Sequence, residues 1–348
     1  MNNKQSIYSF TLQALEEKIV SLGLKKYNAL QIFQWIYQKN CQSFLNMSNI
    51  AKTSLAILEN NFEINKLQIE NKWIDENDGT IKFLFKLGDG QHVETVVMKF
   101  DYGYSVCIST QVGCNMGCKF CASGLLKKIR NLSTDEMVLQ ILGVNEYLQR
   151  NSGAKVSNVV VMGIGEPFDN YENLSNALKI IKENHAIGIG SRHITVSTCG
   201  VAPKIIEFGN DFNQINLAIS LHAPNNEIRD KIMPVNKAYP LQVLFNALRK
   251  YSSTVNRKIT FEYLLLGGVN DSVQNAVELS KLVKEFECYV NLIIYNSVDE
   301  HSFKRSANSK SFAETLIHNG VKVTTRLERG SRISAACGQL RANHEKNK

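Results

Sequence analysis

From about residue 100 onward, short apolar runs alternate with helical stretches, and this alternation constrains the fold more than any other feature. The runs have the length and composition of buried strands. They cover 104–109, 157–162, 192–198, 214–220, 258–265 and 289–295. Strands that alternate with helices are typical of parallel βα units, and about six units fit an open form of the (β/α) barrel. We therefore predict an α/β fold, a partial (β/α)6 barrel, over residues 101–300.

The first hundred residues carry two other patterns. Apolar residues recur at helical spacing between about 8 and 62, which indicates a small amphipathic helical module. Between about 66 and 100, short apolar runs such as 81–85 and 93–98 are separated by turn residues, as in antiparallel strands. The expected division is a helical accessory domain at 1–65, a short β extension at 66–100, the barrel at 101–300, and a C-terminal helix, strand and loop at 301–348.

Composition narrows the class of protein. No run approaches the roughly 18 consecutive apolar residues of a membrane span, and the polar start lacks the apolar stretch of a signal peptide. We expect a cytoplasmic protein with no membrane contact. Its eight cysteines are then unlike a disulfide framework, because reducing compartments keep thiols free unless they bind metal or react. The formal charge of +8 favours a polyanion such as RNA, although many proteins with such a charge bind none.

Three cysteines follow the first predicted barrel strand with the spacing C-x3-C-x2-C: Cys114, Cys118 and Cys121. Thiolates are soft ligands that suit iron–sulfur clusters or zinc, and the tight spacing lets one loop wrap a single metal centre. A cubane cluster held by three cysteines leaves one iron open to a cofactor or substrate. The alternative is a zinc site with a histidine as fourth ligand, drawn from elsewhere in the chain. Candidates for it are His92, His193 and His222.

Polar residues stand at the ends of several predicted strands. Carboxyl ends of parallel strands meet on one face of such a barrel, so these residues are expected to form a cofactor site. Taken singly, each has another interpretation, such as a turn, a helix cap or a structural histidine. The candidates are Gly165 and Glu166 after the second strand, Ser197 at the third, Ser220, Leu221 and His222 at the fourth, and Asn296 at the sixth.

This cysteine spacing at the end of the first barrel strand resembles the radical S-adenosylmethionine (SAM) superfamily. The resemblance implies a [4Fe-4S] cluster on the three cysteines, with the amino and carboxylate groups of SAM on the open iron. One electron from the cluster then cleaves the sulfonium to a radical. The resemblance also implies that the polar residues at the strand ends contact SAM.

Two further cysteines narrow the resemblance. Cys107 lies seven residues before the triad, and Cys337 lies in the segment Ala-Ala-Cys-Gly-Gln-Leu at 335–340. This segment resembles a signature of the RlmN/Cfr family of RNA adenine methyltransferases, and the likeness extends over nearly the whole chain. Both cysteines could instead be small buried hydrophobes. The remaining three match no motif, and we interpret them as structural: Cys41, Cys199 and Cys288.

The family resemblance implies roles for these residues. Carbon 2 of adenine is electron-poor, so it cannot attack a sulfonium methyl group directly. One SAM would methylate Cys337, and a second would supply the radical that activates this methyl group for addition to adenine. Cys107 would then attack Cys337 to release the RNA, leaving a disulfide that a cellular thiol reductant reopens. Glu94 matches the family's proton acceptor, although an acidic residue in an alternating strand is equally typical of a solvated face.

The resemblance further implies substrates and partners. Pro167 resembles the branch that methylates carbon 2, where the carbon-8 branch more often has alanine; Arg332 and Ser334 stand where relatives carry acidic residues. The implied targets are 23S rRNA at the peptidyl-transferase centre and the adenosine beside the anticodon in tRNA. The implied partners include a flavodoxin- or ferredoxin-type electron donor, with RNA binding by 1–65 and a monomeric chain. Basic residues that could hold phosphates, or lie on a solvated face, are Lys25, Lys26, Lys127, Lys128 and Arg130.

Three alternatives stay open at this point. One is a carbon-8 adenine methyltransferase of the Cfr type. Another is a radical SAM enzyme that acts on a peptide or small molecule and uses Cys337 for a different purpose. The third is a non-catalytic, zinc-containing RNA-binding protein, which would be colourless where a cluster makes the protein brown.

Overall fold

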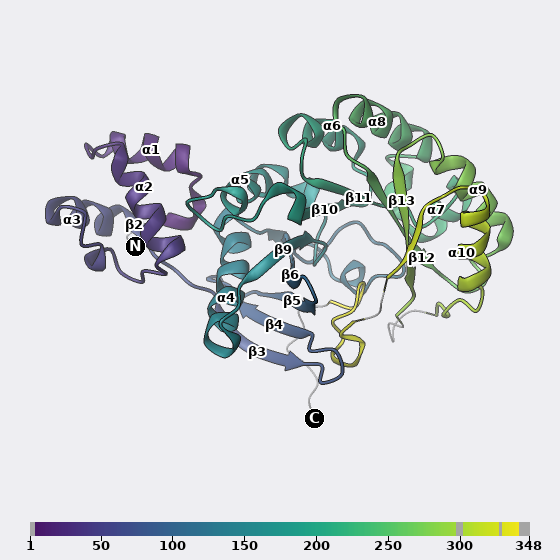
Figure 1. Cartoon of the computed structure of the whole chain (residues 1–348), viewed down its shortest axis with the longest axis horizontal. Coiled ribbons are helices and arrows are strands. Elements are labelled where there is room, and N and C mark those ends of the chain that lie inside the picture. The colour runs from purple at the N-terminus through teal and green to yellow at the C-terminus, as the bar shows by residue number, and fades with distance from the viewer. Residues whose placement is uncertain (1–3, 297–301, 327–328, 341–348) are drawn as a thin grey trace.

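A ten-stranded sheet runs through the middle of the molecule (Figure 1). The computed structural model describes residues 4–296, 302–326 and 329–340. The strand order is β14-β13-β12-β11-β10-β9-β6-β5-β4-β3. From β6 to β14 all neighbouring strands pair in parallel. These parallel strands are β6 (Gly103–Ile108), β9 (Val156–Val161), β10 (Ile194–Thr198), β11 (Asn216–Ser220), β12 (Ile259–Leu265), β13 (Cys288–Ile294) and β14 (Val323–Thr325).

The six barrel strands predicted from the apolar runs are confirmed as β6 and β9 to β13. Each differs from its predicted bounds by at most two residues, the largest shifts being the starts of β10 and β11. The apolar runs predict these strands well because a parallel strand is covered on both faces. In β11, for example, Leu217, Ala218 and Ile219 are all buried. The α/β barrel class is likewise confirmed, with β14 extending the sheet at its far edge.

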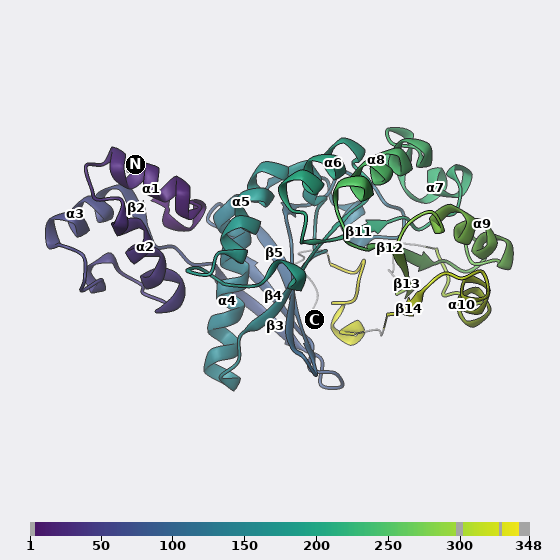
Figure 2. The ribbon, with the colours of Figure 1, turned by 45° about the horizontal axis from the view of Figure 1, so that its top comes forward.

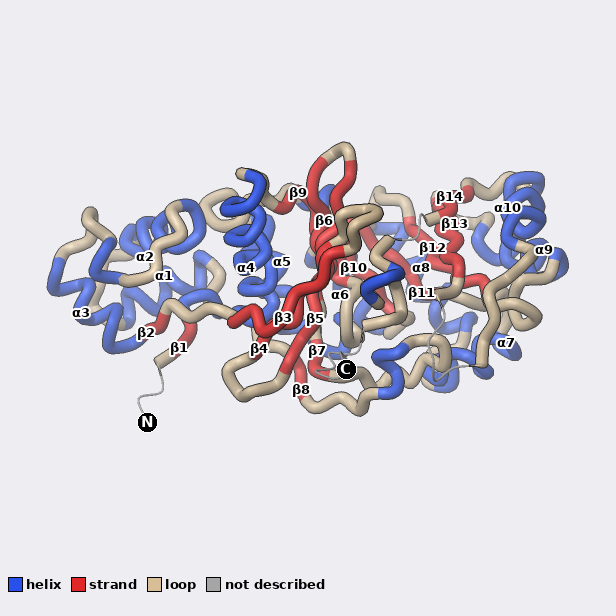
Figure 3. Tube along the Cα trace, turned by 90° about the horizontal axis from the view of Figure 1, so that it is seen from below, coloured by secondary structure: helices blue, strands red, loops and turns tan. Residues whose placement is uncertain are grey.

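The β extension is continuous with the barrel. Its strands β3 (Gln68–Ile74), β4 (Ile81–Lys86) and β5 (His92–Phe100) are antiparallel, and β5 pairs with β6 so that Val96 lies opposite Cys107. Figure 3 shows these strands following one another across the middle of the molecule. Side chains of the extension therefore reach the same region as the first barrel strand.

Helices cover the outside of the parallel sheet, leaving an open inner side on which the C-terminal segment lies (Figure 2). The first of them, α4, begins after Ser133 with a capping box, in which the backbone N–H of Ser133 donates to Glu136 over 3.0 Å. It ends at Gly153, whose φ of 67° suits glycine. The outer helices are α4 (Thr134–Ser152), α5 (Tyr171–Lys182), α6 (Ala202–Asp211), α7 (Asn226–Ile232), α8 (Leu241–Thr254), α9 (Val273–Val283) and α10 (Ser309–His318).

The N-terminal helices form a separate layer at one end of the sheet, next to α4 (Figure 1). Polar contacts join this layer to α4: the amide of Asn65 donates to Asp135 over 3.2 Å, and Lys66 pairs with Glu146 at 2.9 Å. The elements of the layer are α1 (Leu12–Ser21), α2 (Tyr27–Phe33), which continues as a π-helical turn to Gln38, α3 (Lys52–Asn61), β1 (Gln5–Ser6) and β2 (Phe62–Glu63).

A small two-stranded sheet, β7 (Gln111–Val112) with β8 (Arg130–Asn131), flanks the loop that carries the three clustered cysteines. Its pairing closes that loop at the base, so that the residues between the two strands fold back over the barrel mouth. Among the described residues, no helix is both long and apolar enough to cross a membrane.

Candidate active site at the carboxyl ends of the parallel strands

The loop between β7 and β8 brings Cys114, Cys118 and Cys121 to one pocket at the barrel mouth, which we call the cluster-loop pocket. Backbone contacts hold the loop in place. The N–H of Cys114 donates to the carbonyl of Leu126 over 3.0 Å, and that of Lys119 to Ile232 over 2.9 Å. Burial raises the pKa of the Cys114 thiol to about 11 and that of the Cys118 thiol further. The pocket therefore collects three half-buried cysteines on one short loop.

The predicted strand-end residues largely meet in the same pocket. It is lined by Gly165, Glu166, Ser197, Ser220 and His222, besides the three cysteines and Cys337. Leu221 is fully buried and does not line the pocket; its backbone N–H donates to Glu262 over 3.1 Å. Four parallel strands thus contribute polar groups to a single concave site.

Glu166 is oriented by backbone groups. Its carboxylate accepts from the N–H of Cys199 over 2.7 Å and from that of Phe168 over 3.0 Å, while its own N–H donates to Gln111 over 2.9 Å. Burial raises the pKa of the Glu166 carboxyl, and the hydrogen bonds from Cys199 oppose this rise. Gly165 precedes it with a φ of 106°, and a Cβ there would lie only 2.6 Å from the Cβ of Gln111. This turn therefore requires glycine.

His222 is a neutral, buried side chain of the pocket wall. Its Nδ1 accepts from the backbone N–H of Leu264 over 3.0 Å, which places the ring proton on Nε2. Burial, with a contribution from Arg229, lowers its pKa to about 3. His222 also packs edge-on against Phe120 of the cysteine loop, with ring centroids 4.9 Å apart. The histidine joins β12 to the cysteine loop and stays uncharged at neutral pH.

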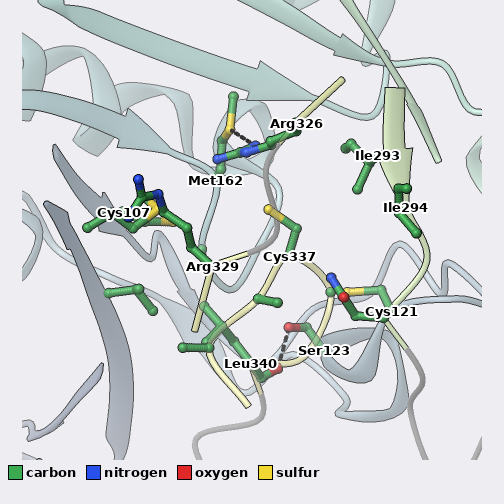
Figure 4. A pocket seen from close by; sticks show the side chains of 17 residues that line it. Cys107, Cys121, Ser123, Met162, Ile293, Ile294, Arg326, Arg329, Cys337 and Leu340 are labelled. Carbon is green, nitrogen blue, oxygen red and sulfur yellow. Dashed lines mark hydrogen bonds between the residues drawn. The ribbon is translucent and has the colours of Figure 1, made fainter. Parts of the chain in front are cut away.

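A second pocket adjoins the first and contains Cys107 and Cys337 on its walls; we call it the two-cysteine pocket (Figure 4). Cys107 is buried, which raises the pKa of its thiol to about 12, whereas Cys337 is exposed. The Cys337 thiol, on the wall of the same pocket, adds to this rise. Cys121 lines both pockets and connects them.

Arg326 is a wall of both pockets, and the Cys337 side chain points toward it in Figure 4. Its backbone N–H donates to Leu292 over 2.9 Å, which anchors it beside β13, and its guanidinium reaches the sulfur of Met162 over 3.8 Å. The Cys337 thiol is the largest influence on the pKa of Arg326, which it raises. A positive charge therefore lies next to the exposed thiol.

The residues that follow Cys337 are hydrogen-bonded to the cysteine loop. The N–H of Ala122 donates to the carbonyl of Gly338 over 2.7 Å, and the hydroxyl of Ser123 donates to that of Leu340 over 2.7 Å. These two bonds are made by the two residues that follow Cys121, and they hold Cys337 over the junction of the two pockets (Figure 4).

Asn296 and Glu94 lie at the margins of the site. Asn296 lines the two-cysteine pocket, and its buried Oδ1 has no hydrogen-bond partner among the described residues, which suits a polar ligand. Glu94 is 3% exposed, so the solvated-face alternative is wrong. Its side chain lines neither pocket and pairs with Lys82 at 3.1 Å, while Val96, two residues on, does line the two-cysteine pocket.

Sequence reasoning missed three side chains of the site: Glu262, Arg326 and Cys199. Glu262 is a buried carboxylate on β12, in hydrogen-bond contact with Asn291 at 2.8 Å, and burial raises its pKa. An acidic residue inside an otherwise apolar strand was a usable signal for it. Cys199 and Arg326 follow strand ends without a distinguishing motif, so only the folded chain reveals them.

The basic residues considered as phosphate contacts are partly engaged within the protein. Lys128 pairs with Asp169 at 2.7 Å, and Arg130 pairs with both Glu136 and Asp89 at 2.7 Å. Arg130 therefore closes the base of the cysteine loop against α4. Lys26 pairs with Glu16 at 3.1 Å on an exposed surface.

A partial parallel barrel with a three-cysteine loop at its mouth defines the radical SAM class, and comparisons with known proteins agree. The model of the radical SAM superfamily matches residues 108–280. The model of the ribosomal RNA large subunit methyltransferase N-terminal domain matches residues 5–64. A radical SAM methyltransferase from Sphaerobacter thermophilus, whose crystal structure is known, is 40% identical and superposes with a TM-score of 0.91, covering 97% of this chain and all of that one.

Two full-length relatives make the assignment specific. The probable dual-specificity RNA methyltransferase RlmN of Malacoplasma penetrans is 52% identical, covering 97% of this chain and 96% of the relative. That of Spiroplasma citri is 51% identical, covering 98% of each. The chain belongs to the RlmN family of radical SAM methyltransferases.

The residues present fit the cofactors that this family implies, a [4Fe-4S] cluster and SAM. Three thiols on one loop are the donor set of such a cluster, and the polar strand-end groups line the same pocket. No three His, Cys, Asp or Glu side chains in the described ranges converge as ligands of a single metal ion. This does not bear on a cluster, because each thiolate of a cubane binds its own iron and the ligands lie farther apart.

Proposed function

We propose that this protein methylates carbon 2 of an adenine in 23S rRNA, and of the adenine next to the anticodon in tRNAs, through a methylated cysteine. The observation that carries the proposal is the shared pocket of Cys107 and Cys337, next to Cys121 of the cysteine loop. A radical SAM enzyme without such chemistry has no need of two further thiols at its site. The full-length likeness to proteins named dual-specificity RNA methyltransferases supports RNA as the substrate.

Cys114, Cys118 and Cys121 would hold the cluster, and the strand-end residues would bind SAM. The SAM contacts we propose are Gly165, Glu166, Ser197, Ser220, His222 and Asn296; Leu221, expected with them, does not line the pocket. When bound, the cluster and two SAM molecules per turnover supply a methyl group and a one-electron route to activate it. The neutral His222 and the buried Glu166 keep this wall of the pocket fixed, because each is already tied to backbone N–H groups.

Cys337 would accept the methyl group on its sulfur, beside the positive charge of Arg326, and carry it to adenine. The chain and the RNA are then joined through the Cys337 sulfur. Cys107 would attack that sulfur and form a disulfide with Cys337; the transferred carbon leaves with the electron pair of the broken bond and takes up a proton to become a methyl group, which balances the proton lost from the Cys107 thiol. Glu94 would hold the proton lost from carbon 2. A thiol reductant would reopen the disulfide, and a flavodoxin- or ferredoxin-type donor would supply the electron.

The division of labour along the chain follows from these roles. We propose that residues 1–65 bind RNA, that 66–100 and 301–348 support the catalytic cysteines, and that the barrel at 101–300 holds the cofactors. The protein would act as a monomer in the cytoplasm. Part of the segment 301–348 lies outside the described residues, as does the tail after Leu340.

The direct test is mass spectrometry of RNA nucleosides. Anaerobically reconstituted protein is incubated with SAM, a reductant, and protein-free ribosomal RNA or tRNA. We expect 2-methyladenosine that depends on the reductant and on SAM. Formation of 8-methyladenosine would favour the Cfr-type alternative, and SAM cleavage without any methylated RNA would contradict the proposed substrate.

Replacing Gly165 with alanine should weaken SAM binding by about tenfold or more. The new Cβ would clash with Gln111, which orients Glu166, and the positive φ is strained for any residue but glycine, at a cost of roughly 1–3 kcal/mol. Equilibrium titration of SAM into cluster-loaded protein measures the effect. The matched control is Gly153→Ala at the end of α4, which has a similarly positive φ but open space around it. Equal affinities in the two variants would contradict the assigned SAM site.

Replacing Cys107 with alanine should trap the protein on its RNA. Without the second thiol nothing breaks the bond between the Cys337 sulfur and the transferred carbon, so we expect free product to fall by at least about a hundredfold. A denaturing gel with end-labelled RNA detects the covalent adduct. Cys41→Ala, at a buried cysteine of the N-terminal layer, should release product normally. Normal product release by the Cys107 variant would contradict the proposal that Cys107 attacks the Cys337 sulfur.

A further inference from the structure

Lys82 is a buried lysine that faces the inside of the β extension. It lies on β4 directly opposite Val96 of β5, which makes Glu94 its diagonal neighbour on the same face of the sheet. Its ammonium is 3.1 Å from the carboxylate of Glu94, and both side chains are buried. A buried lysine is rare unless a partner compensates its charge, so this pair is a built feature of the fold.

The same ammonium also contacts the segment that carries Cys337. Its Nζ donates to the backbone carbonyl of Ser334 over 3.3 Å, and its remaining side faces the ring of Trp73 at 4.7 Å. An ammonium has three N–H donors, and here its three partners are a carboxylate, a carbonyl and an aromatic face. Ser334 lies three residues before Cys337 and has a φ of 50°, a backbone conformation that a serine rarely adopts.

Other contacts attach the start of this segment without involving Glu94. The N–H of Gly330 donates to the carboxylate of Asp78 over 2.9 Å, and the guanidinium of Arg329 lies over the ring of Phe100 at 4.5 Å. These anchors act on residues 329 and 330. At the strained turn nearest Cys337, Lys82 donates to the backbone and holds the Glu94 carboxylate at the same time.

We propose that Lys82 is a positioning residue that couples the charge of Glu94 to the seating of the Cys337 segment. The inference rests on the proposed function, in which Glu94 takes the proton from carbon 2. Before that step, carboxylate and ammonium are paired, and the ammonium is held where it can bind the Ser334 carbonyl.

Proton transfer changes this balance. The electrons of the broken C–H bond stay in the ring, the proton forms the neutral acid of Glu94, and the pair goes from zero net charge to one positive charge. A buried ammonium without its anion is costly, so Lys82 is driven to rearrange, and its bond to Ser334 weakens. The Cys337 segment is thereby loosened at the stage when Cys107 must reach the Cys337 sulfur.

Hydrogen exchange on cluster-loaded full-length protein tests the coupling without any RNA. We expect Lys82→Met to speed exchange of the Ser334 and Ala335 amides by about tenfold, the lower end of what a hydrogen bond from a charged donor contributes. Glu94→Gln, which removes the charge at nearly constant shape, should loosen the same amides. The double variant should be no worse than Lys82→Met alone, because the two groups act through one contact.

The matched control is Lys86→Met, at an exposed lysine on the same strand, which should leave exchange unchanged. Lys82→Arg keeps the charge and the donors and should restore most of the protection. Exchange at Ser334 and Ala335 that is unaffected by Glu94→Gln, or effects that add in the double variant, would overturn the coupling. If Lys82→Met fails to hold its cluster, Glu94→Gln and Lys82→Arg carry the comparison.

A second readout separates the inference from the proposed function. With RNA present, Lys82→Met should cleave SAM within about twofold of the wild type and release covalent adduct at least as fast, because its Cys337 segment is already loose; a general loss of folding would not preserve both activities. If the wild-type protein forms no methylated RNA, the proposed function is contradicted, but the hydrogen-exchange result is unaffected. Accumulation of covalent adduct in Lys82→Met would overturn the inference alone.

Discussion

Replacing Cys337 with alanine is expected to abolish RNA methylation, by at least about a thousandfold, while leaving the cluster and SAM cleavage in place. The thiol is exposed and lines both pockets, so its loss creates no cavity in the core. The substitution would remove the sulfur that we propose as the methyl acceptor. Cys107 cannot readily replace it as a nucleophile, because Cys107 is buried and its thiol pKa is raised. Nucleoside mass spectrometry and assay of 5′-deoxyadenosine measure the two activities separately.

Ser331→Ala is the control for this variant. Ser331 is an exposed residue of the same segment, six positions before Cys337. The Ser331→Ala protein should therefore methylate RNA normally. Detectable 2-methyladenosine from Cys337→Ala would rule out a methyl-cysteine route. Loss of SAM cleavage in that variant would instead assign the thiol to cofactor binding.

Replacing Cys118 with serine is expected to remove the iron–sulfur cluster and, with it, all SAM cleavage. A serine oxygen is a hard ligand that does not replace a thiolate on iron, and Cys118 is the middle one of the three proposed ligands. Iron content should fall from about four per chain, and absorbance near roughly 400 nm should disappear, as expected for loss of thiolate-ligated iron. Iron analysis and anaerobic absorption spectra measure both.

Cys288→Ser is the matched control, because Cys288 begins β13 at the opposite end of the strand from the site. It should retain a full cluster. A Cys118 variant that keeps its iron and colour would contradict the assigned ligand set. Stoichiometric zinc in the wild-type protein, with no iron after reconstitution, would favour the non-catalytic alternative.

Much of the barrel could be predicted because its strands are locally encoded. Buried parallel strands read as continuous apolar runs, and β9, β11 and β12 appear in the sequence within two residues of their bounds. The capping box at the start of α4, formed by Ser133 and the Glu136 three residues on, is likewise a local signal. Short-range chemistry of this kind does not depend on the rest of the chain.

The electrostatics of the site could not be predicted, because they arise from residues far apart in the chain. Lys82 contacts a carbonyl 252 positions away, and the sequence left open whether Glu94 is a proton acceptor or lies on a solvated face, the second of which its burial excludes. Arg326 carries no motif, yet it lies beside both proposed catalytic thiols. Each of these contacts exists only once the β extension and the C-terminal segment lie on the same side of the barrel.

The sequence by itself determined the class of chemistry, since C-x3-C-x2-C at the end of a strand and the segment around Cys337 are contiguous patterns that a linear reading recovers. Only the tertiary structure decided how Cys107 and Cys337 share a pocket and which charges surround them. The physical reason is that ligand spacing on one loop is a local property, whereas burial and Coulomb interactions depend on distances that packing alone sets.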